Sequence, residues 1–413
     1  MRVRGPSLRW LPGVLLLTTL LALTAPPRAM AAEAAIRLSE TCPPGFELRD
    51  GRRCLLRNLY EFYDSLQGAG LGGTRTHLPP HRDGFSPQQI DLGRYLFFDP
   101  LLSADRSLSC ASCHDPALGF SDARPRSSGI GGAQTPRAAP SLWNAAFLKR
   151  FFWDGRAASL EEQAQGSLYS PVEMGHTPDG LLAALAAVPE YRRLFDEAFP
   201  GGASGVSLAD LYTALAAFQS SLVSLNSRYD RYALGHAAAL DAREIAGLNV
   251  FRSFVARCSE CHTPPLFTNQ QLAVIGAPEP EGRALDVGAE AILHAPKLKG
   301  AFKVPTLRNI ALTAPYMHSG RFATLRETVD FYNRGRGHAI PPGVAMYPHW
   351  HIVSPELREE EVELLVAFLA TLSDQSLAPA VPERLPSGLA PFGQRAAGVR
   401  LSDNNNPATG DPT

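Results

Sequence analysis

The chain has 413 residues, which is long enough for two domains and terminal extensions. Its formal net charge of −1 provides no basic surface field, and this argues against nucleic acid as a partner. Hydrophobic residues make up 45% of the sequence, as in ordinary globular proteins, while 35 glycines and 35 prolines predict long structured loops and few extended strands.

The first 31 residues are expected to be a secretory signal peptide. Arg2, Arg4 and Arg9 precede a short apolar core from Leu11 to Ala25, and Ala29-Met30-Ala31 fits a cleavage site. The core is too short and too poorly flanked for a stable membrane span, and no later segment is long and apolar enough to be one. We therefore expect an exported protein with no stable membrane span after cleavage; an uncleaved anchor is the alternative.

Residues 32–84 form an N-terminal extension of irregular pattern, apart from a short helix expected near Leu55 to Gln67. The extension contains Cys42 and Cys54, which lie in a loop rich in proline and arginine. In an oxidising compartment these two thiols are expected to form a disulfide that closes a small loop. Free thiols or a metal pair are the alternatives.

The other four cysteines lie in two copies of the pattern C-x-x-C-H. This pattern attaches c-type haem, because the two thiols add across the haem vinyl groups and the adjacent imidazole ligates the iron. A single C-x-x-C would also suit a dithiol or half of a zinc site. Two copies in an exported chain, each closed by histidine, predict two covalently bound haem c groups and a location in a bacterial periplasm or an equivalent space. The predicted haem-binding residues are Cys110, Cys113, His114, Cys258, Cys261 and His262.

Helical patterns surround both motifs. One helix is expected to begin at Ser86, where Ser86 and Gln89 form a capping box and Pro87 suits the first turn, and to end near Asp99. Another amphipathic helix is expected from Asp241 to Arg257 and to end at the second motif. Further helices are expected at Leu160–Gln165, Leu181–Ala187, Tyr191–Ala198, Leu208–Leu225 and Pro355–Leu372.

The two motifs lie 148 positions apart (258 − 110 = 148), and each follows a helical pattern. This weak internal duplication predicts two small helical haem domains, at residues 85–235 and 236–375. Beyond Ser373 the chain is rich in proline, alanine, glycine, asparagine and aspartate and shows little periodicity. Residues 376–413 are therefore expected to be a disordered tail.

Several stretches outside the motifs carry a family pattern. They are Ser107-Leu108-Ser109, Phe152-Trp153-Asp154-Gly155-Arg156, Leu160-Glu161-Glu162-Gln163, Pro171-Val172-Glu173-Met174, and Phe302 to Asn309 continuing to Pro315-Tyr316-Met317-His318. Together with the haem motifs, the stretches resemble the bacterial dihaem cytochrome c peroxidase and MauG family. The resemblance implies an all-α enzyme with two cytochrome-c-like haem domains packed side by side, long loops and little or no sheet.

The resemblance also implies catalytic roles for three residues. The haem of the first motif would react with peroxide, and the haem of the second would pass or store oxidising equivalents. Trp153 would lie between the haems as an electron relay, while Gln163 and Glu173 would line the peroxide pocket. Glu173 is the expected acid/base and Gln163 a positioning hydrogen-bond donor. From the residues alone, a core tryptophan, a helix-surface glutamine and a capping glutamate remain alternatives.

The far ligands of the two irons are expected to differ. No histidine lies between Asp115 and Gly175, and Ile130 stands about where family peroxidases place a histidine cap, so the first haem should be five-coordinate or water-bound. The family's far-ligand position for the second haem falls on Tyr332. A tyrosinate is an anionic oxygen donor that favours ferric and higher states, in contrast to methionine, which raises the potential. Met346 or a histidine of His349-Trp350-His351 is the alternative ligand.

Two positions depart from the family pattern. Ser167 stands where a proline is usual, which predicts a more polar peroxide pocket. Ala138 stands where the family's interhaem calcium site uses an asparagine side chain, and backbone oxygens near Thr313 and Pro315 remain as ligands. One calcium ion is thus a candidate third cofactor with a weaker ligand set.

These observations favour a hydrogen-peroxide-dependent oxidoreductase. Its reductant would be a small periplasmic electron donor, either a cytochrome c or a cupredoxin. The first alternative is MauG-like oxidative modification of the side chains of a partner protein, towards which Tyr332 and the missing loop histidine both point. The second alternative is a non-catalytic dihaem electron carrier, which the ten-residue spacing of Gln163 and Glu173 (173 − 163 = 10) argues against.

Overall fold

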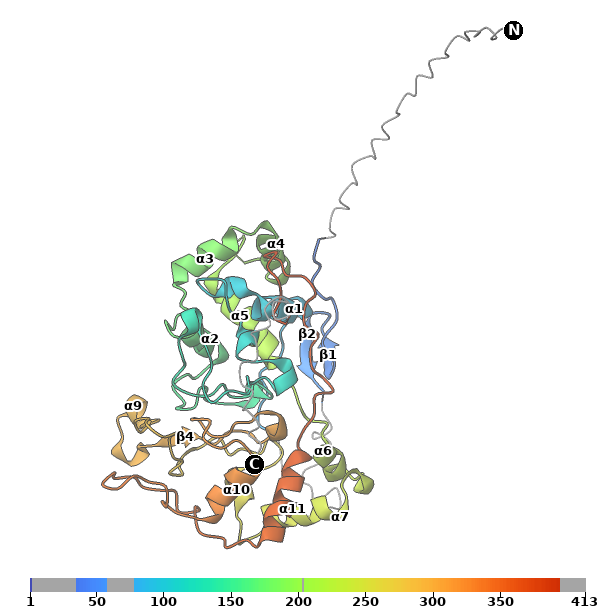
Figure 1. Cartoon of the computed structure of the whole chain (residues 1–413). Coiled ribbons are helices and arrows are strands. Elements are labelled where there is room, and N and C mark those ends of the chain that lie inside the picture. The colour runs from blue at the N-terminus through green and yellow to red at the C-terminus, as the bar shows by residue number, and fades with distance from the viewer. Residues whose placement is uncertain (2–34, 58–77, 203, 394–413) are drawn as a thin grey trace. The chain divides into compact units, whose positions relative to one another are not determined.

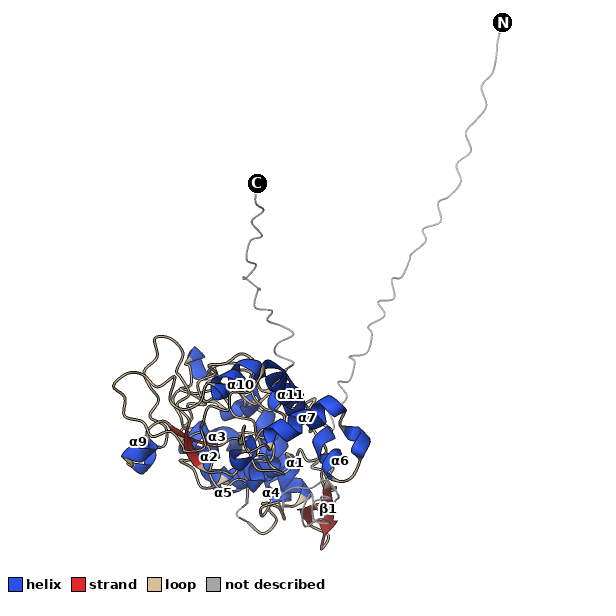
Figure 2. Cartoon of the chain, turned by 90° about the horizontal axis from the view of Figure 1, so that it is seen from below, coloured by secondary structure: helices blue, strands red, loops and turns tan. Residues whose placement is uncertain are grey.

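The computed structural model describes Met1 and residues 35–57, 78–202 and 204–393. Helices joined by long loops dominate this part of the chain, and its strands form only two small two-stranded sheets (Figures 1 and 2). The expected all-α class is therefore confirmed. No helix in the described ranges is long and apolar enough to cross a membrane. The expected signal peptide falls on residues 2–34, outside the described part.

The α-helices are α1 (Pro87–Phe98), α2 (Leu160–Leu168), α3 (Pro178–Ala186), α4 (Pro189–Ala198), α5 (Leu208–Ser220), α6 (Arg228–Ala233), α7 (Ala242–Phe251), α8 (Cys258–Cys261), α9 (Glu290–Leu293), α10 (Leu325–Asn333) and α11 (Glu359–Ala370). Antiparallel pairs are formed by β1 (Phe46–Arg49) with β2 (Arg53–Leu56) and by β3 (Leu272–Val274) with β4 (Ala301–Lys303). Short 3-10 helices connect several of these elements.

Local capping chemistry sets the start of several helices. The Ser86 hydroxyl oxygen accepts a hydrogen bond from the Gln89 backbone N–H, and the Gln89 side-chain oxygen accepts one from the Ser86 backbone N–H, so the capping box expected before α1 is confirmed. Asp241 and Glu244 form the same box before α7. Both boxes satisfy backbone N–H groups that the first helical turn leaves without partners.

Several helix predictions are wrong in extent. The helix expected at Leu208–Leu225 ends at Ser220, and the helix expected from Pro355 begins at Glu359. Residues 53–56, where a helix was expected to begin, form β2, which pairs with β1 and lies next to the confirmed Cys42–Cys54 disulfide; residues 58–67 lie outside the described part. The helix expected to continue to Arg257 ends at Phe251. Arg257 adopts a left-handed backbone conformation (φ 56°), which no right-handed helix can include.

One helix crossing occurs twice in the fold. α1 packs against α5, and α7 packs against α11 (Figure 1). A Cβ atom on Gly93 would lie 1.9 Å from the Ala214 carbonyl oxygen, and one on Gly247 would lie 2.0 Å from that of Leu364. Glycine is therefore required at both crossings, because the two backbones come too close for any side chain. The repeated crossing explains the weak duplication in the sequence.

Each crossing belongs to its own apolar core. The first core contains Phe97 and Phe218 and reaches Cys110, while the second contains Phe251 and Phe368 and reaches Cys258. Residues from Ile36 onward nevertheless form one compact unit. The domain boundaries at 85–235 and 236–375 therefore stay a prediction.

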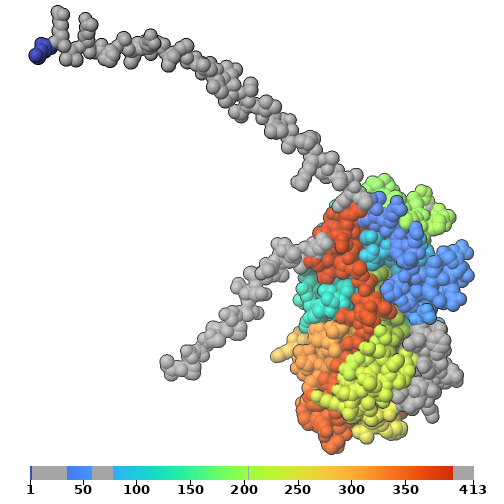
Figure 3. Space-filling view, turned by 90° about the vertical axis from the view of Figure 1, so that its right-hand side faces the viewer, coloured from blue at the N-terminus to red at the C-terminus, as the bar shows by residue number. Residues whose placement is uncertain are grey.

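The C-terminal segment corrects another expectation. Residues 376–393, expected to be disordered, pack along the surface towards the first core (red in Figure 3). Leu385 is 1% exposed within that core, and the Ser387 hydroxyl donates to the Asp99 carboxylate over 2.9 Å. The segment has no helix or strand, yet Leu385 is buried, and Leu389 and Phe392 pack partly buried against the first core. Residues 394–413 lie outside the described part.

Candidate active site

Two cavities contain the residues predicted to act. The first cavity is lined by the first C-x-x-C-H motif, and the second cavity by the second motif. Gln163 and Glu173 line the first cavity, Tyr332 lines the second, and Trp153 lines both. The fold therefore brings together every predicted site residue in two adjoining spaces, although their individual roles stay predictions.

The motif histidines are held in the same way in both cavities. His114 Nδ1 donates to the Phe120 carbonyl oxygen over 3.0 Å, and His262 Nδ1 donates to that of Phe267 over 3.1 Å. Since a carbonyl can only accept, Nδ1 carries the proton and Nε2 is left with a lone pair for a metal. Burial lowers the pKa of His114, and it lowers the pKa of His262 to about 4, which favours the neutral imidazole that metal coordination requires.

The four motif thiols fit covalent haem attachment. None forms a disulfide, whereas Cys42 and Cys54 do. Burial raises the pKa of Cys110 and of Cys258 to about 12, so these thiols are protonated before they react. Two free thiols beside a neutral imidazole in an apolar cavity are the donor set that a c-type haem requires.

Three polar side chains converge in the first cavity. Gln163 and Ser167 lie one turn apart on α2, and Gln163 Nε2 donates to Ser167 Oγ over 3.1 Å. Burial raises the pKa of Glu173, and a hydrogen bond with Ser167 together with the charge of Arg156 offsets only part of that rise. Ser167 therefore links the predicted acid/base to the predicted positioning residue. The sequence marked Ser167 only as a departure from the family pattern.

The loop that packs against Glu173 places no histidine in this cavity. Ile130 N–H donates to the Glu173 carbonyl oxygen over 2.8 Å. A Cβ atom on Gly129 would lie 2.0 Å from the Val172 carbonyl oxygen, so the loop backbone lies directly against the Glu173 turn. Within the described ranges, His114 is the one histidine that lines this cavity. Met174 also lines the cavity, but it packs into the first core.

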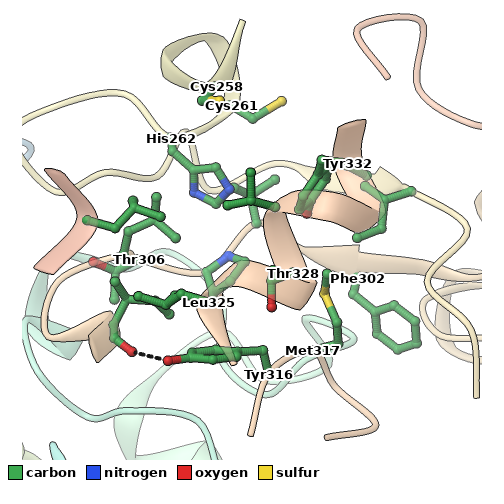
Figure 4. Close-up of a pocket in the computed structure, with 18 of the residues that line it drawn as sticks. Cys258, Cys261, His262, Phe302, Thr306, Tyr316, Met317, Leu325, Thr328 and Tyr332 are labelled. Atoms are coloured by element: carbon green, nitrogen blue, oxygen red, sulfur yellow. Dashed lines mark hydrogen bonds between the residues drawn. The ribbon is translucent and has the colours of Figure 1, made fainter. Parts of the chain in front are cut away.

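Tyr332 enters the second cavity from α10 and faces the same space as His262 (Figure 4). Burial raises the pKa of Tyr332, and the nearby Cys261 and Cys258 thiols raise it further. No side chain in the described ranges hydrogen-bonds the Tyr332 hydroxyl, which leaves its oxygen available.

The alternative ligands differ in their access to this cavity. Met346 does not line it, because its methyl group packs against Gly300, where a Cβ atom would lie 2.2 Å from Met346 Cε. His349 and His351 do line it, and His351 Nε2 forms an ion pair with Glu260 at 2.8 Å. Among the candidate far ligands of the second haem, Tyr332 and His349 therefore have the fewest contacts that would compete with binding to iron.

A second internal repeat relates the two cavities. Asn144 and Asn309 both adopt left-handed conformations and begin 3-10 helices, while Ser159 and Thr324 cap α2 and α10; each pair lies 165 positions apart (309 − 144 = 165 and 324 − 159 = 165). The same offset matches Ser167 with Tyr332 (332 − 167 = 165). One helical position therefore carries a short hydroxyl in the first cavity and a phenol in the second.

Comparison with known proteins identifies the family. The family model for di-haem cytochrome c peroxidases matches residues 87–238. A methylamine utilization protein MauG from Methylorubrum extorquens is 37% identical over 74% of this chain and 83% of its own length. This chain belongs to the di-haem cytochrome c peroxidase family. A cytochrome c551 peroxidase from Pseudomonas aeruginosa is 35% identical over 73% of this chain and 85% of its own length.

A solved structure has the same fold as this family member. A MauG-like protein associated with microbial copper homeostasis aligns with a TM-score of 0.69 at 35% identity, over 75% of this chain and 99% of its own. The likeness extends over three quarters of the chain and agrees with the predicted fold and family.

In this peroxidase-family chain, an ion-pair network surrounds Trp153. Trp153 Nε1 donates to the Ala138 carbonyl oxygen over 2.9 Å. The next residue, Asp154, pairs with the Arg137 guanidinium at 2.6 Å, and Arg137 also pairs with Asp286 at 2.6 Å. Arg137 and Asp286 are 149 positions apart. Sequence reasoning missed this pair, because nothing local in the chain connects its members.

The candidate calcium site stays a prediction. The Ala138 carbonyl oxygen already accepts from Trp153. His318 Nε2 lies 2.7 Å from Glu279 Oε1, and these two residues with Asp286 are close enough together to hold a cation. Thr313 and Pro315 line the second cavity.

Proposed function

We propose that this family member is a periplasmic enzyme that uses hydrogen peroxide as oxidant, with peroxide cleaved in the first cavity and oxidising equivalents shared with the second. One observation carries the proposal: the position that presents Tyr332 to the second cavity presents only Ser167 to the first. The first cavity is therefore open opposite His114 and contains a buried acid. When bound, haem iron supplies the site of peroxide cleavage and the means to store oxidising equivalents.

Glu173 is assigned the proton transfer. Its carboxylate accepts the proton from the peroxide oxygen that binds and returns it to the oxygen that leaves as water. The raised pKa of Glu173, caused by burial, suits this role, because a carboxyl that titrates closer to neutrality both accepts and donates readily.

Gln163 and Ser167 are assigned the orientation of Glu173 and peroxide. The Gln163 amide donates to Ser167, and Ser167 lies near enough to Glu173 to lower its pKa, so the three side chains line one side of the cavity. Such an arrangement fixes the carboxyl direction before substrate arrives.

Trp153 and Tyr332 are assigned the sharing of oxidising equivalents. Trp153 is part of the wall of both cavities, which suits an electron relay between them. Tyr332 closes the second cavity with an anionic oxygen donor when it is deprotonated, and such a donor favours the higher oxidation state. The second centre would then store oxidising equivalents rather than bind peroxide.

The reductant is either a small electron donor or the side chains of a partner protein. The relatives include proteins named MauG and cytochrome c551 peroxidase. Next to the second motif, Phe254 and Trp350 are 87% and 61% exposed, and the Arg257 guanidinium lies over both rings. Exposed aromatic groups around an arginine are typical of protein contact surfaces, so a protein partner would dock here.

Mixing the diferric protein with peroxide and following its visible spectrum tests the proposal. Reaction without prior reduction and a long-lived oxidised state would favour the MauG-like branch. Rapid turnover only after partial reduction would favour the branch with a small electron donor. A protein inert to peroxide, with both irons six-coordinate, would instead support a plain electron carrier.

Export and calcium are parts of the same proposal. Covalent haem motifs together with residues 1–31 favour the periplasm. Calcium binding is tested by metal analysis of the purified protein before and after a chelator, and retained haem spectra without calcium would remove the ion from the proposal.

A further inference from the structure

A lysine forms part of the wall between the two cavities. Lys303, the last residue of β4, lines both of them. The pairing of β4 with β3 and the hydrogen bond from Lys303 N–H to the Trp153 carbonyl oxygen, at 2.7 Å, fix its backbone. Its side chain is therefore held where the two cavities meet.

Within the described ranges, the ammonium group of Lys303 has no counter-charge. Among the described residues none forms an ion pair or a hydrogen bond with its Nζ atom. Burial lowers the pKa of Lys303 to about 8, and no charged neighbour contributes to this shift. Because an unpaired buried charge is strongly unfavourable, a partner is expected from whatever occupies the cavities.

The remaining charges of the cavities point to an anionic occupant. The other cations in the walls all have acidic partners: Arg137 and Arg156 pair with Asp154, Arg257 with Glu260, and Arg308 with Asp230. The residues described as lining the second cavity include no acid, and those lining the first include only Glu173. Lys303 is thus the cation in both walls whose charge is not neutralised by the chain.

We propose that Lys303 is a carboxylate-binding residue shared by both cavities, and that its ammonium group pairs with the propionate carboxylates of the two haems. The inference rests on the proposed occupation of both cavities by haem. Lys303 is one of only four lysines in a chain with 39 lysines and arginines in total. A compact ammonium group with three rotatable donors can serve partners on two sides, whereas a planar guanidinium favours one bidentate partner.

A shared positive charge has a consequence for both redox centres. It stabilises the added electron at either iron, since opposite charges attract more strongly inside a protein than in water. Lys303 therefore raises both reduction potentials and couples them through one group.

The test measures both midpoint potentials of the haem-loaded protein by spectroelectrochemical titration without peroxide. Lys303→Met should lower both midpoint potentials, so that the equilibrium constant for reduction of each haem falls by about threefold or more. Lys303→Arg, which keeps the positive charge, should restore both potentials. Lys297→Met is the matched control, because Lys297 is exposed and lies in the same segment. It should leave both potentials unchanged.

Three results would overturn the inference: unchanged potentials in Lys303→Met, a shift at one centre only, or an equal shift in the control. If Lys303→Met takes up too little haem, Lys303→Gln, which keeps a donor but loses the charge, is judged by the same criteria. The titration contains no peroxide, so a failure of the proposed peroxide chemistry would leave this result unaffected and the two outcomes distinguishable.

Discussion

Ser167 and Tyr332 occupy the same position in two copies of one helix, 165 residues apart, and each faces its own cavity. The difference between a hydroxymethyl and a phenol group makes two related cavities chemically unequal. The serine side chain is much shorter, and it accepts a hydrogen bond from Gln163 and lowers the pKa of the nearby Glu173. The tyrosine occupies the corresponding helical position in the second cavity, which His262 also lines.

Replacing Tyr332 with methionine should raise the potential of the second centre. A neutral thioether favours the reduced state relative to a tyrosinate, and we expect a rise of at least about 60 mV, a tenfold change for one electron. A potentiometric titration followed by electron paramagnetic resonance measures the potential of the second centre. Tyr316→Phe is the control, since Tyr316 lines the same cavity but donates to the Ile310 carbonyl oxygen. Unchanged spectra in Tyr332→Met would point to His349 or His351 instead.

Glu173→Gln should slow the reaction with peroxide by about 10²–10⁴-fold, because it removes the proton acceptor and keeps the shape. In the parent protein, the rate should fall as pH decreases through the raised pKa of Glu173, at a pH above that of a free glutamate. Stopped-flow measurements across pH test both statements. If the rate of Glu173→Gln still falls at low pH as it does in the parent protein, another group is the base. Glu162→Gln serves as a nearby control and should leave the rate unchanged.

Arg137→Gln should destabilise the protein by about 3–5 kcal/mol, because Asp286 would lose its arginine partner and Asp154 would keep only Arg156. Burial alone would raise the pKa of Asp286, but the hydrogen bond and charge of Arg137 outweigh it and lower that pKa. A lowered carboxyl pKa contributes stability above the unfolded pKa and loses it as pH falls through the folded pKa.

Denaturation midpoints at neutral pH and at about pH 3, near the unfolded aspartate pKa, test this claim. The difference between parent and Arg137→Gln should shrink at the lower pH. Arg321→Gln, at an exposed position, should change neither midpoint. An Arg137→Gln protein as stable as the parent would show that solvent reaches both acids.

Gly247→Ala should destabilise the second half by about 1–3 kcal/mol or more, because the added methyl would lie 2.0 Å from the Leu364 carbonyl oxygen. Gly202→Ala is the control, since its nearest contact would be 3.3 Å away. Chemical denaturation monitored by helical circular dichroism compares the two. Equal midpoints would mean that α7 and α11 separate easily.

Local chemistry made much of the fold predictable. Ser86 and Asp241 cap their helices with side chains only three residues from their partners, so their patterns can be read directly. Haem attachment and the cavity residues followed from short motifs and a family resemblance. The pair of Arg137 with Asp286 and the position of Lys303 could not be predicted, because each depends on segments brought together only by folding.

The same reason explains the mistaken C-terminal tail. Irregular segments are positioned by long-range contacts rather than by periodicity. Leu385 finds its place in a core built mainly from residues 87–222, and nothing near it in the sequence predicts that contact.

Because the C-terminal segment packs into the first core, that core can be completed only late in the synthesis of the chain. Ser387 and Leu385 complete the surroundings of Asp99 and the first core, although they follow the whole second half in the chain. The first half is therefore not finished when it leaves the ribosome. Its core closes only after the last described residues arrive, so a chain cut between the halves would lack part of the first half's own interior.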